Sequence, residues 1–221
     1  MRKTTSKDHT SQQIDFHFKR FMNWEIKKYM SIIKSVCVFC GSGYGGKDEI
    51  IETTRTLAKN MIAMNMNLIF GGGNDGLMKA LADEFMLKER TVIGVIPQEY
   101  VDKNREYPNM TKLITTKNMA ERTEVMMELA DGFIVLPGGY GTINELFTVL
   151  FSARMGKITK PCAVLNVTSY FDFLLKFLDE SVKNGLLGSS PRNVLFSSDA
   201  PEIILEYFLN YEPIVITSKW V

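Results

Sequence analysis

Histidine and long hydrophobic runs are what this sequence of 221 residues most clearly lacks. Its only two histidines, His9 and His17, lie in a polar segment ahead of any plausible core, which argues against a Ser-His-Asp or Cys-His catalytic site. No stretch approaches the roughly 20 apolar residues that span a bilayer, and the N-terminus lacks the apolar run of a secretory signal. We therefore expect a cytoplasmic protein that has no membrane partner.

Cysteine is also scarce, and the charge is balanced. Cys37, Cys40 and Cys162 make an odd number of thiols, which is typical of free cysteines in a reducing compartment. Cys37 and Cys40 have the spacing of redox and zinc sites, but residues three apart in a strand point to opposite faces, and no histidine or second pair completes a metal site. A net charge of +1 offers no basic excess for a nucleic-acid partner.

The chain divides into a polar N-terminal extension, 1–30, and a single domain, 31–221. The stretch 16–24 of the extension is rich in aromatic residues and predicts one short amphipathic helix. Met30 directly precedes the first expected strand, and we interpret it as an alternative start codon.

From residue 35 onward, short apolar runs alternate with longer segments of helical period, which predicts a Rossmann-like α/β fold with a doubly wound parallel sheet and helices on both faces. Ligands of such sheets bind at the carboxyl ends of the strands. The segment 214–217 is either a further strand or a dimer contact. The expected strands are 36–39, 68–70, 92–96, 112–115, 133–136 and 163–166, and the expected helices are 48–64, 76–88, 119–130, 142–154, 171–184 and 201–210.

The first of three glycine-rich loops, 41–48, fits two nucleotide-binding patterns and completes neither. As G-x-G-x-x-G it lacks an acidic residue at the end of the second strand, where 71–73 are glycines, so a nicotinamide dinucleotide loses its ribose anchor. As G-x-x-x-x-G-K-[ST] it has Asp48 where a hydroxyl would bind magnesium. The loop either is a simple turn or lines a nucleotide pocket.

The second and third loops point more clearly to a ligand. Three consecutive glycines, 71–73, exceed the needs of a turn, and they indicate either close approach of a ligand or packing against a neighbouring strand. The third loop, 137–142, opens a helix, so its backbone amides can cradle a phosphate. Thr142 and Glu145 also fit the Thr-x-x-Glu capping box, which leaves Glu145 as either a functional carboxylate or a helix cap.

The segment Pro137–Glu145 resembles the PGGxGTxxE signature of the LOG phosphoribohydrolases. Other stretches resemble this family in the same order, over about residues 35–210. They are 36–42, 71–73 with 76–78, 92–97, 119–122, and 160–161 with 165–167. The resemblance implies a Rossmann-like fold and hydrolysis of a cytokinin riboside 5′-monophosphate, or of AMP itself, to free base and ribose 5-phosphate, with no cofactor and no metal.

The resemblance also assigns the site. The arginine of the family's Met-x-x-Arg motif and the glutamate of its glycine motif form the catalytic pair, and these are Arg122 and Glu145 in this chain. Thr123 stands where the family usually has lysine, which removes one positive charge and bears on phosphate affinity. For the family's substrate-contacting glutamate there are two candidates, Glu106 and the position of Asn104. The substrate-binding residues implied are Ser42, Gly72, Gly73, Glu106, Thr123, Gly138, Gly139, Tyr140, Gly141 and Thr142.

Cleavage of an N-ribosidic bond develops positive charge on the sugar and negative charge on the departing base. Glu145 is expected to stabilise the sugar cation and to orient or deprotonate the attacking water. Arg122 is expected to hold the phosphate or the leaving purine.

Two other functions stay open. A non-catalytic carrier of a nucleotide or of the molybdenum cofactor would not need Arg122 and Glu145 together. A broader AMP or pyrimidine-nucleotide nucleosidase keeps the chemistry and changes the base. The family was formerly labelled lysine decarboxylase, but no lysine here is singled out at a strand-end loop as a pyridoxal Schiff base requires. The resemblance implies at least a homodimer, and Met119, Met126 and Met127 are expected to be packing surface.

Overall fold

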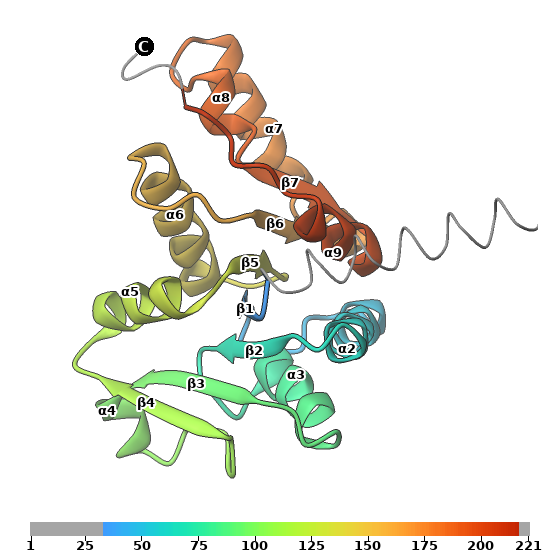
Figure 1. Ribbon diagram of the computed structural model, residues 1–221, viewed down its shortest axis with the longest axis vertical. Helices are drawn as coiled ribbons and strands as arrows, with labels where there is room; N and C mark the ends of the chain where they lie inside the picture. Colours follow the sequence, from blue (N-terminus) through green and yellow to red (C-terminus); the bar gives the residue numbers. More distant parts are fainter. Residues whose placement is uncertain (1–32, 217–221) are drawn as a thin grey trace, which may run out of the picture. The chain divides into compact units, whose positions relative to one another are not determined.

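Seven parallel strands form one sheet in the computed structural model, which describes residues 33–216 (Figure 1). The predicted extension, its amphipathic helix and Met30 therefore lie outside the described residues. The order across the sheet is β4-β3-β2-β1-β5-β6-β7. The strands are β1 (Ser35–Phe39), β2 (Asn67–Phe70), β3 (Val92–Pro97), β4 (Lys112–Thr116), β5 (Gly132–Val135), β6 (Cys162–Leu165) and β7 (Leu195–Ser198).

Helices cover both faces of this sheet. One layer contains α2, α3 and α9, and the other contains α5, α6, α7 and α8 (Figure 1). Among the described residues, no helix is both long and apolar enough to cross a membrane. The helices are α2 (Asp48–Ala63), α3 (Gly76–Met86), α4 (Gln98–Val101), α5 (Met119–Leu129), α6 (Tyr140–Arg154), the 3-10 turn η1 (Val167–Ser169), α7 (Asp172–Lys183), α8 (Ser189–Arg192) and α9 (Pro201–Leu209).

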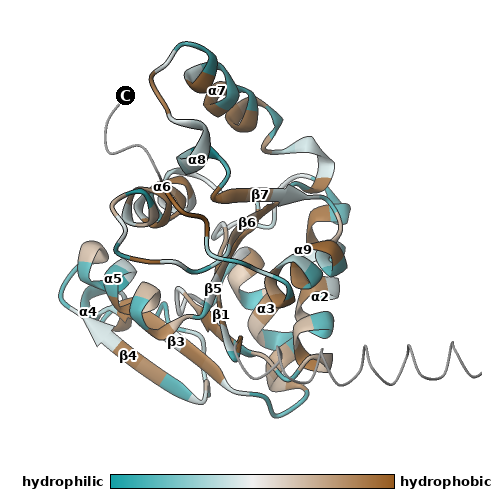
Figure 2. Ribbon diagram, turned by 45° about the horizontal axis from the view of Figure 1, so that its top comes forward, coloured by the Kyte–Doolittle hydropathy of each residue, from teal (hydrophilic) through white to brown (hydrophobic). Residues whose placement is uncertain are grey.

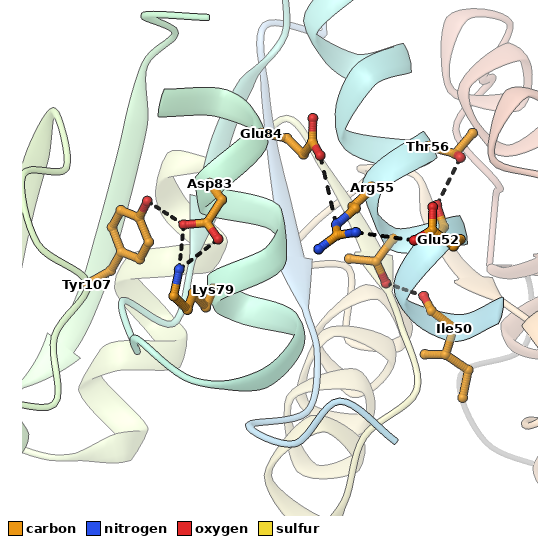
Figure 3. Close-up of polar contacts among 9 residues, drawn as sticks. Ile50, Glu52, Arg55, Thr56, Lys79, Asp83, Glu84 and Tyr107 are labelled. Carbon is orange, nitrogen blue, oxygen red and sulfur yellow. Dashed lines mark hydrogen bonds and ion pairs between the residues drawn. The ribbon is translucent and has the colours of Figure 1, made fainter. Parts of the chain in front are cut away.

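The hydrophobic pattern explains both kinds of element. Every residue of β5 and β6 is buried, because helices cover a parallel sheet on both faces. In α2 the buried side chains recur at helical spacing, from Ile50 through Leu57 to Met61, while Arg55 lies on the polar side and pairs with Glu52 and Glu84 (Figure 3). Figure 2 shows that the strands are largely hydrophobic, whereas helices such as α7 carry both hydrophobic and hydrophilic residues.

The predicted α/β fold is confirmed, and each of the six expected strands and six expected helices is present within two residues of its expected bounds. The prediction missed β7, an edge strand beside β6. Of the two alternatives for 214–217, the strand is excluded for 214–216, which have no regular structure. These residues stay exposed or half-buried, so little burial offsets the entropy of ordering them. Thr217 lies outside the described residues.

The point where the strand order reverses lies between β1 and β5. The chain builds the sheet outward from β1 to β4, then returns to place β5 on the other side of β1. Just beyond these two strands, Gly41 N donates to Pro137 O at 3.0 Å, so the first and third glycine loops meet. A doubly wound sheet opens its ligand crevice at this reversal.

Candidate active site

A cavity of about 330 Å³ opens at the carboxyl ends of β1, β2, β3 and β5. Glycine loops and the first turn of α6 form one part of its wall, and the segment after β3 forms another. Pockets of this size hold small organic ligands. The described residues that line it are Cys40, Gly41, Ser42, Gly71, Gly73, Asp75, Met78, Ile96, Pro97, Tyr100, Arg105, Met119, Arg122, Gly139, Tyr140, Gly141, Thr142 and Glu145.

Arg122 from α5 and Glu145 from α6 form a buried ion pair that lines this cavity. Arg122 Nη2 donates to Glu145 Oε1, and the two side chains are 12% and 5% exposed. Burial raises the pKa of Glu145 to about 7, while the positive charge and hydrogen bond of Arg122 act in the opposite direction. Glu145 is therefore a carboxyl group that can exchange a proton near neutral pH.

One hydrogen-bond donor of the Arg122 guanidinium is free to bind a ligand. Its Nε is buried and has no hydrogen-bond partner among the described residues. A buried donor without a partner is costly, and such groups often mark a place where a ligand or water binds. Nη1 lies 3.5 Å from Met119 Sδ, so the guanidinium is oriented by contacts on two sides.

Gly71 makes room for this arginine, a role that the sequence analysis did not assign. A Cβ at Gly71 would lie 3.1 Å from Arg122 Nη2 and 3.1 Å from Met78 Sδ. The first of the three consecutive glycines therefore leaves space for the Arg122–Glu145 pair.

Helix α6 begins two residues earlier than predicted, at Tyr140, with Gly139 as its N-cap. Thr142 is thus inside the helix, and the capping-box interpretation of Thr142 and Glu145 is wrong. No side chain of the described residues caps this end. Because the first amides of a helix have no acceptor within it, the N–H groups of 139–142 are available to an anion.

Eight of the predicted site residues line the cavity together. They are Arg122, Glu145, Ser42, Gly73, Gly139, Tyr140, Gly141 and Thr142. Their convergence follows from the topology, since the loops after β1, β2 and β5 and the start of α5 all lie at one edge of the sheet.

Two predicted glycines are tightly packed against neighbouring residues, and the described lining of the cavity includes neither. Gly72 has φ +73, and a Cβ there would lie 3.1 Å from Ile96 Cβ on the neighbouring strand. A Cβ at Gly138 would lie 2.1 Å from Thr142 Oγ1 and 2.8 Å from Gly41 N. Packing against a neighbouring strand, the alternative for the second loop, is therefore correct for Gly72.

Thr123 and Glu106 also lie outside the described lining. Thr123 is buried in α5, and its hydroxyl donates to Met119 O at 3.1 Å. Glu106 pairs through its backbone with Gly73, and its Oε2 is buried with no partner among the described residues. Asn104, the other candidate for the family's glutamate, is exposed and has φ +52.

Arg105 and Asp75 line the cavity although the sequence analysis assigned neither. Arg105 Nη2 donates to Asp75 Oδ2 at 2.9 Å, and both side chains are more than half exposed. The backbone beneath them is joined as well, because Asn74 N donates to Arg105 O at 3.0 Å. The pair thus places one positive and one negative charge at the β2–β3 side of the cavity.

A polar cluster on α3 fixes the segment that carries Arg105. Tyr107 OH donates to Asp83 Oδ1 at 2.8 Å, and Lys79 Nζ donates to both oxygens of the same carboxylate (Figure 3). Tyr107 N also donates to Gly72 O at 2.8 Å. The segment 105–107 is therefore tied both to α3 and to the second glycine loop.

The cysteines are free and buried. Burial raises the pKa of Cys37 and of Cys40 well above the ordinary value, and it raises that of Cys162 to about 12. Cys40 lines the cavity, but a protonated thiol is a weak nucleophile at neutral pH. Within residues 33–216, no three His, Cys, Asp or Glu side chains are grouped as a metal site.

Known proteins match this chain over most of its length. A family model described as "possible lysine decarboxylase" matches residues 78–208. The probable cytokinin riboside 5′-monophosphate phosphoribohydrolase LOGL2 of Oryza sativa subsp. japonica is 34% identical over 194 residues, covering 86% of this chain and 80% of that protein. The cytokinin riboside 5′-monophosphate phosphoribohydrolase LOG5 of Arabidopsis thaliana is 34% identical over 199 residues, covering 86% and 87%.

Solved structures share the fold. The molybdenum cofactor binding protein of Rippkaea orientalis superposes with a TM-score of 0.60 at 18% identity, covering 79% of this chain and 94% of that one. The molybdenum cofactor carrier protein of Chlamydomonas reinhardtii gives 0.59 at 16% identity, covering 81% and 99%. Identities this low establish the architecture alone. The family match and the two plant relatives establish more, and this chain belongs to the LOG family.

Proposed function

We propose that this protein hydrolyses the N-glycosidic bond of an adenosine 5′-monophosphate, and that the preferred substrate carries a substituent on N6. The observation that carries the proposal is the buried Arg122–Glu145 pair beside the uncapped first turn of α6, in one cavity. The plant relatives are named for this reaction on cytokinin riboside 5′-monophosphates. The products are the free base and ribose 5-phosphate.

The cavity supports one orientation of the nucleotide. The phosphate binds at the amides of 139–142, where the positive end of the helix dipole favours an anion and Thr142 can donate its hydroxyl. The ribose then lies at Glu145, one turn further along α6. The base points toward the β2–β3 side, where Met78, Ile96 and Tyr100 line the cavity.

Glu145 and Arg122 have different roles in the proposed reaction. The ionised Glu145 carboxylate stabilises positive charge at C1′ and accepts a proton from the water whose oxygen attacks C1′. The C1′–N bond breaks, its electron pair goes to the base nitrogen, and the base takes up a proton. Arg122 holds Glu145 in place, and its unpartnered Nε donates to the substrate. Thr123 adds no charge to the cavity, so the helix amides and Arg122 supply the attraction for phosphate.

The apolar part of the cavity supports an N6 substituent. Met78, Ile96, Pro97, Tyr100 and Met119 line it together. Each CH₂ group that a substituent buries against such a surface adds about 0.8 kcal/mol to binding. Methionine is also well suited to irregular apolar groups, because its side chain is flexible.

We further propose a homodimer. Large apolar side chains are exposed along one side of α6, namely Phe147, Phe151 and Met155, and Tyr140 at the mouth of the cavity is 97% exposed on the same helix. On α7, Phe173 and Phe177 are also exposed. Contiguous apolar surface of this kind marks an interface, which would reach the edge of the site. The free, buried cysteines favour a reducing, cytoplasmic compartment.

The test is to incubate the purified protein with AMP, N6-isopentenyladenosine 5′-monophosphate and UMP, and to follow free base and ribose 5-phosphate by chromatography. Release of base from the adenine nucleotides supports the proposal, and the ratio of rates identifies the substrate. Release from UMP as well indicates the broader nucleosidase. Binding of nucleotide without any release favours the carrier.

A further inference from the structure

Tyr170 connects two distant loops of the site. Its hydroxyl donates to the carbonyl oxygen of Gly138 at 2.7 Å, across 32 positions of sequence. Tyr170, Thr168 and Gly138 line a second cavity, of about 550 Å³. It adjoins the candidate active site and shares Gly41, Ser42 and Gly139 with it. The tyrosine therefore contacts the glycine loop from the second cavity, and the described lining of the candidate active site does not include it.

The geometry of a peptide unit makes this contact informative. In a planar trans peptide, the C=O of residue 138 and the N–H of residue 139 point in opposite directions. Because Tyr170 holds the Gly138 oxygen, the Gly139 N–H points away from Tyr170, and Gly139 is a residue that lines the active-site cavity. A peptide between two glycines rotates with little steric hindrance, so a specific hydrogen bond is needed to keep it in one orientation.

A strained turn holds Tyr170 in place. Thr168 and Ser169 have φ values of 56 and 59, a left-handed conformation that is costly for non-glycine residues and most of all for a β-branched one. Asn166 braces the turn, since its Oδ1 accepts from Phe171 N at 2.7 Å and its Nδ2 donates to Asp172 Oδ1 at 2.7 Å. Strain that persists in this way is often maintained for function.

We infer that Tyr170 is a positioning residue for the phosphate subsite: its hydroxyl fixes the Gly138–Gly139 peptide so that the Gly139 amide donates to the nucleotide phosphate. Tyr170 itself does not touch the substrate. The inference rests on the proposed function for the identity of the ligand. It predicts that loss of the hydroxyl weakens recognition of the phosphate and leaves recognition of the nucleoside unchanged.

The variant Tyr170→Phe isolates the hydroxyl, because the ring keeps its edge-to-face contact with Phe171 at 5.0 Å. One lost hydrogen bond of this kind predicts a rise of about 3- to 10-fold in KM for AMP, with kcat changed less than about 2-fold. Tyr211→Phe is the matched control. The partly buried hydroxyl of Tyr211 is hydrogen-bonded to the backbone of Ile214, close to the C-terminal end of the described residues. We expect the control to change neither constant.

Binding separates this inference from the proposed function. In the Glu145→Gln background, calorimetry with AMP and with adenosine should show a rise of about 3- to 10-fold in the Kd of AMP on adding Tyr170→Phe, and none for adenosine. Equal changes for the two ligands, or no change for AMP, would overturn the positioning role. If the wild-type protein releases no base, the proposed function fails, and the comparison of AMP with adenosine still decides the role of Tyr170.

Discussion

Arg122 on α5 donates to Glu145 on α6, and both side chains are almost fully buried where they line the cavity. Each charge has little exposure to solvent and has the other as its ion-pair partner, so each depends on the other. Removing one member of such a buried pair leaves an uncompensated charge, which costs on the order of 3–5 kcal/mol. The proposed function and the stability of the fold therefore depend on the same two residues.

Glu145→Gln should abolish base release and leave nucleotide binding. The amide keeps the size of the side chain but cannot accept a proton from water or carry the negative charge that faces C1′. We expect a loss of kcat of at least about 100-fold on AMP, measured by chromatography of the base. AMP binding measured by calorimetry should stay within a few-fold of wild type, and its loss would show that the carboxylate acts in binding instead.

The pH profile should report the titration of Glu145. Its pKa is raised to about 7, and its ionised form is the active one, so kcat/KM on AMP should rise with pH and level off above about pH 7. The positive charge of Arg122 lowers the pKa of Glu145, so Arg122→Gln should move the midpoint of the profile to higher pH. Arg122→Lys keeps the charge and should leave the midpoint near that of wild type. An unchanged midpoint in Arg122→Gln would assign the titration to another group.

The titration of Glu145 should also make the stability of the fold decrease as the pH rises. Between the unfolded pKa near 4.5 and the folded pKa near 7, the native state binds more protons than the unfolded state, so Glu145 lowers stability as the pH rises through this window. The effect is on the order of 3 kcal/mol. Denaturant unfolding of wild type and Glu145→Gln across this range should show the difference shifting in favour of the variant as the pH increases.

The sequence could predict the fold because each central strand is buried on both faces and therefore forms a continuous apolar run. It could not predict β7, since Leu195–Ser198 ends in two serines and lies at the edge of the sheet, where only part of the strand is buried. It also placed Arg122 and Glu145 in one site, but through the family motif. The spacing of Thr142 and Glu145 alone fits a helix cap equally well.

Other site residues depend on tertiary contacts that no local pattern records. Arg105 lies in an irregular segment. Its position at the cavity depends on the hydrogen bond from Asn74 to its backbone carbonyl, and on the hydrogen bonds that Asp83 and Gly72 accept from the residue two positions further on. Gly71 is needed because an arginine 51 positions later packs on it. These roles become visible only when the loops after β2 and β3 are placed together.

Gly71→Ala should impair catalysis by displacing Arg122. The new methyl group would lie 3.1 Å from Arg122 Nη2, so the guanidinium must move and Glu145 with it. Small displacements of catalytic groups lower rates by about 10- to 100-fold. Gly43→Ala is the control, because nothing lies within 4 Å of its added Cβ. Full activity of Gly71→Ala in the AMP assay would show that the pair tolerates the shift.

The Asp75–Arg105 pair should limit the size of the N6 substituent. An apolar tail that reaches the β2–β3 side must strip water from these charges, which offsets part of the gain from apolar burial. The double variant Asp75→Ala/Arg105→Ala should raise the ratio of kcat/KM for the isopentenylated nucleotide over AMP by about 3- to 10-fold. Its stability should change by less than about 1 kcal/mol, because the pair is more than half exposed.

Arg55→Ala provides the comparison for that variant. It removes an exposed arginine that pairs with Glu52 on α2 and Glu84 on α3 (Figure 3). Arg55 is not among the described residues that line the cavity. In the Arg55→Ala variant, the ratio of kcat/KM for the isopentenylated nucleotide over AMP should not change. If both variants alter the ratio equally, the effect comes from a general loss of surface ion pairs and not from the base side of the cavity.

Phe151→Asp should convert a dimer into monomers. Phe151 is 62% exposed between Phe147 and Met155, in the centre of the apolar side of α6, so a carboxylate there would be desolvated at the interface. Light scattering after size exclusion should give twice the chain mass for wild type and the chain mass for the variant. Leu87→Asp, at a residue 75% exposed beyond the end of α3 on the other face of the sheet, should remain a dimer. Because the apolar side of α6 reaches Tyr140 at the mouth of the cavity, monomers should also lose activity on AMP, and a fully active monomer would show that the site is complete within one chain.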